Sequence, residues 1–185
     1  MDTLDTMDTF VEQIVAKKKG GREYGIIALV VLGALILTAA LFLFIPMLMI
    51  LVVGIGYGAW WLITSQNVEF EYSVTNGDID IDQIVAQRKR KRIVSVAGSK
   101  IESLLPYNAA EQANRHYDRV VLAAPSAEAA TWCFNYHSKK NGHTLVVFAP
   151  EQRVLDALER GLNKLVQLEM KRKAAQAGVS DAAEK

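Results

Sequence analysis

Three groups of residues have types and spacings that suggest metal binding, nucleophilic catalysis or anion binding. In the first group, Asp78, Asp80 and Asp82 alternate as in a calcium loop. Such a loop needs glycine at its sixth position and glutamate at its twelfth, where this chain has Gln83 and Lys89. Strand alternation instead predicts that the aspartates share one solvent-facing side of a strand. We therefore expect no calcium site.

The second group contains the only cysteine of the chain. Cys133 and His137 share one face of a predicted strand, and His143 lies across the following turn. Zinc needs three or four ligands, and the remaining His116 lies in a separate segment without ligand spacing. No carboxylate pattern nearby orients a catalytic histidine. We expect a half-buried thiol, and we predict no enzymatic activity, no metal and no cofactor.

The third group is the basic run at residues 88–92. Each basic residue near an anionic leaflet contributes about 1 kcal/mol. The candidates for contact with lipid head groups are Lys17, Lys18, Lys19, Arg22, Arg88, Lys89, Arg90 and Lys91. On an alternating strand, however, Arg88, Arg90 and Arg92 point to one face, where the acidic hairpin neutralises them. The run contains no aromatic residue for base stacking, so we expect no nucleic-acid partner.

No charged residue occurs from Ile26 to Ile63, a run of 38 residues. One helix of that length would measure about 57 Å, which is roughly twice the hydrocarbon core of a bilayer. The run therefore predicts a transmembrane helical hairpin that folds back at Phe44, Ile45 and Pro46. Each arm has about 17 residues, near the lower limit for spanning, so the hairpin either crosses the bilayer or dips into it as a wedge.

The residues that flank the apolar run predict its orientation. The basic cluster of Lys17, Lys18, Lys19 and Arg22 precedes it, and the positive-inside rule places such a cluster in the cytoplasm. A hairpin returns Thr64 to the same side. Aromatic residues that prefer the head-group level lie near both cytoplasmic ends, namely Tyr24, Tyr57, Trp60 and Trp61.

Gly54 and Gly58 form a G-x-x-x-G motif, which allows another helix to approach closely. We expect these glycines to pack against the first helix of the same chain. The alternative is an oligomer that forms through the same two residues. The run contains no side chain that ionises near neutral pH, and this disfavours a transporter or a channel.

After Thr64 the spacing of the apolar residues changes from the helical period of 3.6 residues to the strand period of 2. Residues 68–75 and 79–84 alternate on either side of Asn76-Gly77, which predicts a β-hairpin. Further strands are predicted at 92–97, 100–105, 119–124, 131–137 and 143–149. Pro150 and leucines at helical spacing predict one C-terminal helix. The expected fold is α+β: a seven-stranded antiparallel barrel or sandwich capped by a C-terminal α-helix.

We expect four parts in the chain. They are a cytoplasmic segment at 1–25, the hairpin at 26–63, a soluble domain at 66–174 and a disordered tail at 175–185. The first segment is either an amphipathic helix or a frayed terminus, and translation starts at Met1 or Met7. The net charge of +1 points to neither nucleic acid nor an acidic substrate, and one cysteine excludes an intrachain disulfide.

Residues 145–150, with Leu155, Ala157 and Leu158, resemble the last strand and capping helix of the pleckstrin-homology-like (PH-like) fold. Residues 67–82 and 88–92 resemble an uncharacterised family of small bacterial membrane proteins, and the resemblance covers nearly the whole chain. It implies a bacterial PH-like domain behind a transmembrane hairpin, and it implies no activity. Lipid-binding eukaryotic members carry basic residues at the first hairpin loop, whereas this chain has Asn76-Gly77-Asp78 there, so phosphoinositide recognition is not implied.

These observations predict a non-enzymatic interaction or scaffolding module, integral to the bacterial cytoplasmic membrane, with its soluble domain in the cytoplasm. Its expected partners are membrane lipid and a protein that the sequence does not identify. The first alternative is a sensor of anionic lipid or of the membrane surface. The second is a Cys133-dependent enzyme.

Overall fold

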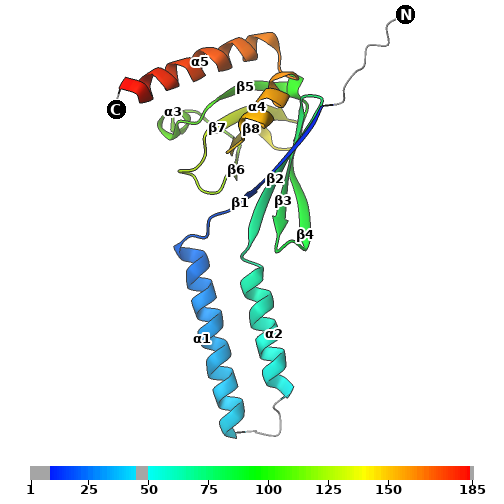
Figure 1. Cartoon of the computed structure of the whole chain (residues 1–185), viewed down its shortest axis with the longest axis vertical. Coiled ribbons are helices and arrows are strands. Elements are labelled where there is room, and N and C mark those ends of the chain that lie inside the picture. Colours follow the sequence, from blue (N-terminus) through cyan, green and yellow to red (C-terminus); the bar gives the residue numbers. More distant parts are fainter. Residues whose placement is uncertain (1–8, 45–49, 184–185) are drawn as a thin grey trace, which may run out of the picture.

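The computed structural model describes residues 9–44 and 50–183 (Figure 1). Two apolar helices extend from one end of a body made of two β-sheets, and a third long helix covers the opposite end. The predicted turn at Ile45 and Pro46 and the alternative starts at Met1 and Met7 lie outside the described residues.

The first sheet has four antiparallel strands in the order β1-β2-β3-β4. They are β1 (Phe10–Ala16), β2 (Val68–Thr75), β3 (Asp78–Val85) and β4 (Lys89–Val96). Our expectation of a helix or a frayed end at residues 10–16 was wrong. Val11, Gln13 and Val15 face the interior while the residues between them face outward, because pairing with β2 selects the period of 2.

Both apolar helices are inserted between β1 and β2 (Figure 1). They are α1 (Gly21–Phe44) and α2 (Ile50–Thr64), and they pack against each other. Ala16 at the end of β1 pairs with Glu69 at the start of β2, and the Lys17 amide donates to the Val68 carbonyl oxygen at 2.8 Å. The start of α1 and the end of α2 are therefore held at the same edge of one sheet. The β-domain thus begins before the apolar helices and not after them.

The second sheet has the order β5-β7-β8-β6, and β6 runs parallel to β8. Its strands are β5 (Ile101–Pro106), β6 (Arg119–Ala123), β7 (Trp132–Ser138) and β8 (Gly142–Phe148). A 3-10 turn, η2 (Gly98–Lys100), precedes β5, and α3 (Ala109–Ala113) precedes β6. In place of the expected seven-stranded antiparallel barrel or sandwich, the described residues form two four-stranded sheets with one parallel strand pair and no closed barrel. The extra strand is β1, which the sequence did not reveal.

Tyr72 joins the two sheets through the core. Its side chain is fully buried on β2, its hydroxyl donates to the carbonyl oxygen of Ala123, and the Ala149 amide donates to the hydroxyl at 3.3 Å. Its ring meets Phe148 edge to face, with centroids 5.6 Å apart. Burial raises the pKa of Tyr72 to about 12, so this bridge stays neutral at physiological pH.

The C-terminal region contains two helices, α4 (Gln152–Glu159) and α5 (Lys164–Ala183), where the sequence predicted one helix followed by a disordered tail from residue 175. Gly161 separates them because its backbone packs directly on the β2–β3 turn. A Cβ atom at Gly161 would lie 2.6 Å from the Cα atom of Gly77, which is closer than real Cβ contacts allow. The helix continues through Ala183.

The outer face of the first sheet carries an ion-pair network, as strand alternation predicted. Arg90 contacts Glu71 and donates from Nε to Asp82 at 2.6 Å. Arg92 donates from Nε to Asp82 at 2.9 Å and from Nη1 to Asp80 at 2.9 Å. Glu71 and Asp82 are buried, with only 4% exposure each. The two arginines are therefore structural partners of these carboxylates.

We expect Asp82→Asn to lower the free energy of unfolding by about 2 kcal/mol at pH 7, because it removes charge-assisted hydrogen bonds. The bond from Arg92, with a further bond from Arg90, holds the pKa of Asp82 below its ordinary value. A depressed folded pKa stabilises the fold above the unfolded pKa near 4, and this stability is lost as the pH falls through the folded value. The difference in the free energy of unfolding between wild type and variant should therefore become smaller below about pH 4.

Circular dichroism of the full chain in detergent, followed through thermal unfolding at pH 7 and at pH 3, measures this difference. Glu12→Gln is the matched control, since Glu12 is exposed on the same sheet face. Equal destabilisation by the two substitutions, or a gap that does not change with pH, would contradict the assigned role of Asp82.

Candidate functional site

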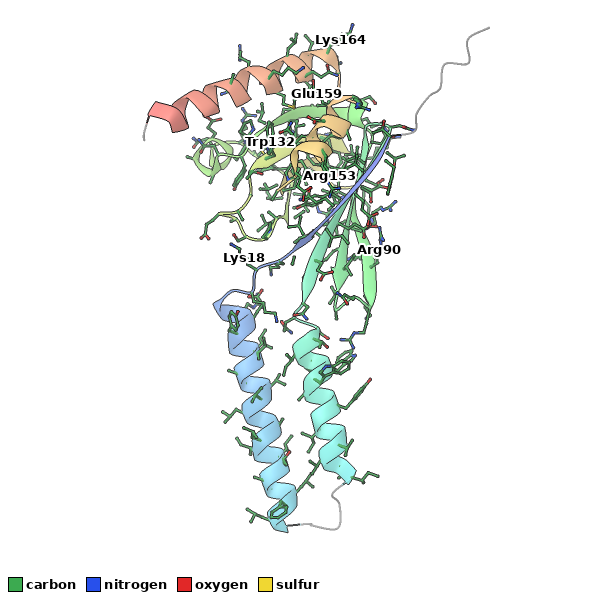
Figure 2. The ribbon with its side chains drawn as sticks, in the orientation of Figure 1. Lys18, Arg90, Trp132, Arg153, Glu159 and Lys164 are labelled. Atoms are coloured by element: carbon green, nitrogen blue, oxygen red, sulfur yellow. The ribbon has the colours of Figure 1, made fainter. Side chains whose placement is uncertain are left out.

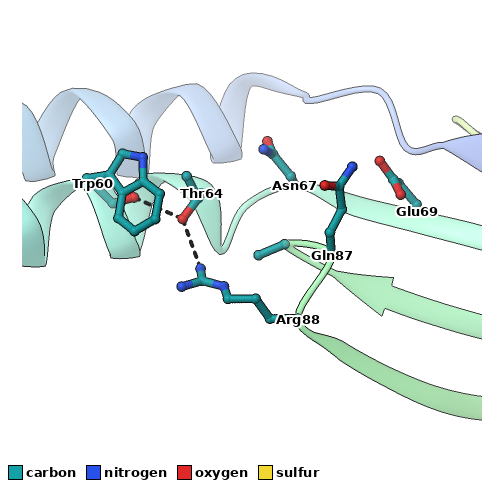
Figure 3. A pocket seen from close by; sticks show the side chains of 7 residues that line it. Trp60, Thr64, Asn67, Glu69, Gln87 and Arg88 are labelled. Carbon is teal, nitrogen blue, oxygen red and sulfur yellow. Dashed lines mark hydrogen bonds between the residues drawn. The ribbon is translucent and has the colours of Figure 1, made fainter.

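A pocket of about 440 Å³ lies where α2 joins the first sheet (Figure 3). We call it the junction pocket. The last turn of α2, the start of β2 and the β3–β4 turn form its walls. The lining residues are Trp60, Thr64, Asn67, Glu69, Ala86, Gln87 and Arg88.

Arg88 connects the β3–β4 turn to the end of α2. Its Nη2 atom donates to Thr64 Oγ1 at 2.9 Å, and its Cζ atom lies 5.8 Å and 5.4 Å from the ring centroids of Trp60 and Trp61. A cation at a helix C-terminus is favourable because the last carbonyl groups carry negative partial charge. Stacking over indole rings adds about 0.5–1 kcal/mol at exposed sites. Arg88 is thus bound to α2 and does not join the pairs that Arg90 and Arg92 make.

The β3–β4 turn has an unusual backbone. Ala86 and Gln87 have φ angles of 53° and 55°, a region that costs residues with a Cβ atom roughly 1 kcal/mol or more. The Ala86 amide donates to the Asn67 carbonyl oxygen at 2.7 Å, which fastens the turn to the start of β2. This conformation could not be predicted from the residue types, since turns with positive φ usually contain Gly or Asn.

The entry to α1 is fixed by equally short-range contacts. Lys17 Nζ lies 2.8 Å from Glu23 Oε1, and the Gly20 amide donates to Glu23 Oε2 at 3.0 Å. The Lys18 amide donates to the Pro125 carbonyl oxygen at 2.8 Å, so the segment before α1 also contacts the loop that follows β6. Lys18 lies near the start of α1 (Figure 2). Both helices are therefore joined to the β-domain without a free linker.

The four aromatic residues singled out in the sequence lie on the helices and are largely exposed. Tyr24 lies one turn into α1, and its side chain is 62% exposed. Trp60 and Trp61 are 55% and 46% exposed in the last turns of α2, and Tyr57, 65% exposed, stacks near Trp60 at 5.7 Å. The start of α1 and the end of α2 both lie next to the β-sheets (Figure 1), so the helix turns that carry these residues are at the domain end of the helix pair.

The packing expected for Gly54 and Gly58 does not occur. Cβ atoms built at these positions meet no heavy atom within 4 Å, so neither glycine brings α2 close to α1. The partly buried positions of α2 are Val52, Ile55, Gly58, Ala59, Ile63 and Thr64, mostly spaced three or four residues apart. Oligomerisation through the two glycines stays a prediction.

The candidate thiol lies in a small apolar cluster. Cys133 is 2% exposed and packs with Leu145 and Val147. Burial raises the pKa of its thiol to about 11, which opposes formation of the nucleophilic thiolate. His137 is exposed and pairs across the hairpin with His143. The sequence grouping of Cys133 with the histidines therefore does not produce an activated nucleophile.

Sequence reasoning missed a polar network on the outer face of the second sheet. His143 Nε2 lies 3.3 Å from Glu102 Oε2 and 2.9 Å from Asn135 Nδ2, and Asn135 in turn donates to Glu102 at 3.2 Å. The rings of Tyr117 and His143 have centroids 5.0 Å apart. No local signal links these residues, because they come from three different strands and a loop. Across the described parts of the chain, no group of three or more His, Cys, Asp or Glu residues is arranged to hold a metal ion.

Comparison with known protein families shows which family the chain belongs to. The model of the bacterial PH-like domain (DUF6106) matches residues 7–167. The chain belongs to this family. The match runs from just before β1 into α5, so the two apolar helices lie inside the PH-like region. No curated protein and no solved structure matches the chain.

We predict that Cys133 of the folded PH-like domain reacts with maleimide at pH 7.5 at least 100-fold more slowly than an exposed thiol, since both burial and the raised pKa suppress the thiolate. Ser95→Cys supplies the exposed thiol in the same chain, because Ser95 lies on the solvent side of β4. Denaturation should make the two rates equal. Rapid labelling of Cys133 in the native protein would contradict this assignment.

Proposed function

We propose that this chain is a membrane-anchored, non-enzymatic interaction module whose PH-like domain faces the cytoplasm and holds a protein partner near the bilayer. Membership of the PH-like family supports a binding or scaffolding role. The observation that carries the proposal is the pairing of Ala16 with Glu69, which holds both apolar helices at one edge of the sheet.

The lengths of the helices support anchoring. Within the described residues, α1 is the one helix long and apolar enough to cross a membrane, and its 24 residues measure about 36 Å. The 15 residues of α2 are all apolar or uncharged and measure about 22 Å. Since both helices leave the sheet at adjacent positions, insertion of α1 brings α2 into the same apolar layer.

The position of α1 between β1 and β2 also argues that α1 stays in the mature protein and is not cleaved off as a signal sequence. An apolar helix near the N-terminus passes the same test of length and composition as a signal sequence. Cleavage after α1 would remove β1 from its sheet, together with the buried Gln13 side chain, which donates to the Ala149 carbonyl oxygen at 3.2 Å and accepts from the Glu151 amide at 2.7 Å. The domain therefore needs the segment that precedes α1.

The anionic-lipid sensor, the alternative from the sequence, has weaker support. Of the residues predicted to contact head groups, Lys17 is paired with Glu23, Arg88 is bound to α2, and Arg90 is paired with two carboxylates. Lys18, Arg22, Lys89 and Lys91 are exposed, and Lys19 is partly buried. This arrangement leaves two small groups, one of Lys18, Lys19 and Arg22 around the start of α1 and one of Lys89 and Lys91 on β4. Electrostatic attraction to a leaflet is strongest for clusters of about four to eight basic residues.

A surface suited to a protein partner lies at the opposite end of the domain from the apolar helices. A hollow of about 280 Å³ between α4 and α5 is lined by Trp132, Leu155 and Met170, among others, with the Lys171–Glu159 ion pair of 2.7 Å at its rim. Leu165 and Leu168 of α5 are 75% and 67% exposed. Trp132 and Glu159 lie in the part of the domain covered by α5 (Figure 2). Apolar side chains beside a polar rim are typical of recognition surfaces.

The orientation is tested by cysteine accessibility in intact cells. We expect Asp2→Cys and Ser180→Cys to resist a membrane-impermeant maleimide until the cells are permeabilised, because both ends lie in the cytoplasm. Pro46→Cys then distinguishes two full spans, which expose it outside, from a wedge, which does not. Labelling of position 2 or 180 from outside would refute the proposed orientation.

The partner surface is tested by site-specific photo-crosslinking in the membrane. A photoreactive residue at Leu168 should give one discrete protein adduct, because this side chain lies on the exposed face of α5. The same residue at Lys91 is the control, since that position is exposed on the first sheet, away from α5. Identical adducts at both positions, or none at Leu168, would count against a protein partner at this surface.

A further inference from the structure

We propose that the junction pocket binds the head group of a zwitterionic phospholipid that carries a primary amine. In this arrangement Arg88 pairs with the phosphate and Glu69 with the ammonium group. The inference rests on the proposed membrane anchoring, because only an inserted α2 brings lipid head groups to the pocket.

The pocket contains one cation and one anion, and both have unused bonding capacity. The described hydrogen bonds of Arg88 all come from Nη2, which leaves Nε and Nη1 without a partner among the residues that the structure describes. Glu69 is half-buried, and its carboxylate has no hydrogen bond or ion pair within the same residues. Glu71 and Asp82 on the same sheet face are paired with arginines, whereas Glu69 is half-buried and has no such pair in the described part of the chain.

The order of the groups along the pocket follows the order of groups in a phospholipid (Figure 3). Trp60 lies at the α2 end, Arg88 reaches Thr64 at the end of that helix, and Glu69 lies farther along, on β2. A lipid places its acyl chains in the apolar layer, its phosphate at the head-group level and its amine farthest out. Tryptophan prefers that same head-group level. The guanidinium therefore lies at the depth of the phosphate, and the carboxylate lies at the depth of the amine.

The strained turn supports a binding role for this wall of the pocket. Ala86 and Gln87 keep positive φ angles although neither is glycine. Backbone strain of this kind is concentrated at binding and catalytic sites, where surrounding structure maintains it. Here it places Gln87 and Arg88 along the pocket, and the bond from the Ala86 amide to Asn67 maintains it.

The cation and the anion of the pocket predict an order of binding affinity among phospholipids. A primary ammonium donates hydrogen bonds to Glu69, whereas a choline group has the same charge but no N–H donor. A glycerol head group supplies a phosphate and no cation to Glu69. We therefore expect phosphatidylethanolamine to bind best, phosphatidylcholine less well and phosphatidylglycerol least.

The test is native mass spectrometry of the full chain released from micelles that contain equal amounts of these three lipids. Loss of charge-assisted hydrogen bonds corresponds to about tenfold in affinity, so bound ethanolamine lipid should exceed bound choline lipid by about that factor. Glu69→Gln should reduce the ratio to about one. Arg88→Gln should lower all three adducts together, and Arg88→Lys should restore them. Glu12→Gln and Lys89→Gln are charge-matched controls that should leave the ratio unchanged.

Two further arms separate the possible failures. A wild-type ratio near one, or a ratio that Glu69→Gln leaves unchanged, overturns the pocket assignment. Displacement of the lipid by equimolar phosphoethanolamine also overturns it, because a free amine phosphate would then be the ligand. Extraction of the same membranes at alkaline pH tests the anchor itself. A chain that stays in the membrane but shows no lipid preference refutes only the pocket, whereas a chain released by carbonate refutes the anchoring and the pocket together.

Discussion

The antiparallel pairing of β1 with β2 is the constraint on which the rest of this structure depends. The two strands are separated in sequence by both apolar helices, yet they are neighbours from Phe10 opposite Thr75 to Ala16 opposite Glu69. The helices leave and re-enter the sheet at adjacent positions, so a single crossing that separates the two ends is incompatible with this sheet. The geometry of the helix pair thus follows from hydrogen bonds in the domain as much as from the apolarity of the helices.

The same pairing makes the helix end and the sheet one continuous structure. Only Ser65, Gln66 and Asn67 lie between α2 and β2. The β3–β4 turn reaches across this short connection through Arg88 and through the bond from Ala86 to Asn67. The junction pocket is therefore built from residues whose positions depend on both parts. A change in the tilt of α2 would move Thr64 relative to Arg88, and so the pocket and the helix orientation are mechanically coupled.

The sequence predicted the elements that have strong local patterns. The β-hairpin around Asn76-Gly77, most later strands and the apolar helices follow from periodicity and turn chemistry. β1 was not predicted as a strand, because its apolar residues at positions 10, 11, 14 and 15 also fit a helical period. Its partner strand lies more than 50 residues away in the sequence. The break at Gly161 depends on backbone contact with Gly77, which no local pattern encodes.

The candidate site was only partly predictable, for the same reason. Trp60 and Arg88 were recognised separately, as an interfacial aromatic and as part of a basic run, but their contact depends on tertiary structure. Alternation correctly indicated that Arg90 and Arg92 neutralise acidic neighbours. It misplaced Arg88, because this residue belongs to the turn before β4 begins. Alternation also assigned Glu69 to the solvent-facing side of its strand, but its lack of a bonding partner among the described residues is visible only in the tertiary structure, beside the paired Glu71.

The insertion of two helices into a strand pair also imposes an order on biosynthesis. During translation β1 emerges first, and its partner strand β2 follows only after both helices have been made. β1 is therefore unpaired during that interval. Packing of the two helices against each other brings the two strand ends together and shortens the search for the correct register. A nascent chain in which the two helices do not pack together keeps that loop open and exposes an unpaired sheet edge, which favours aggregation.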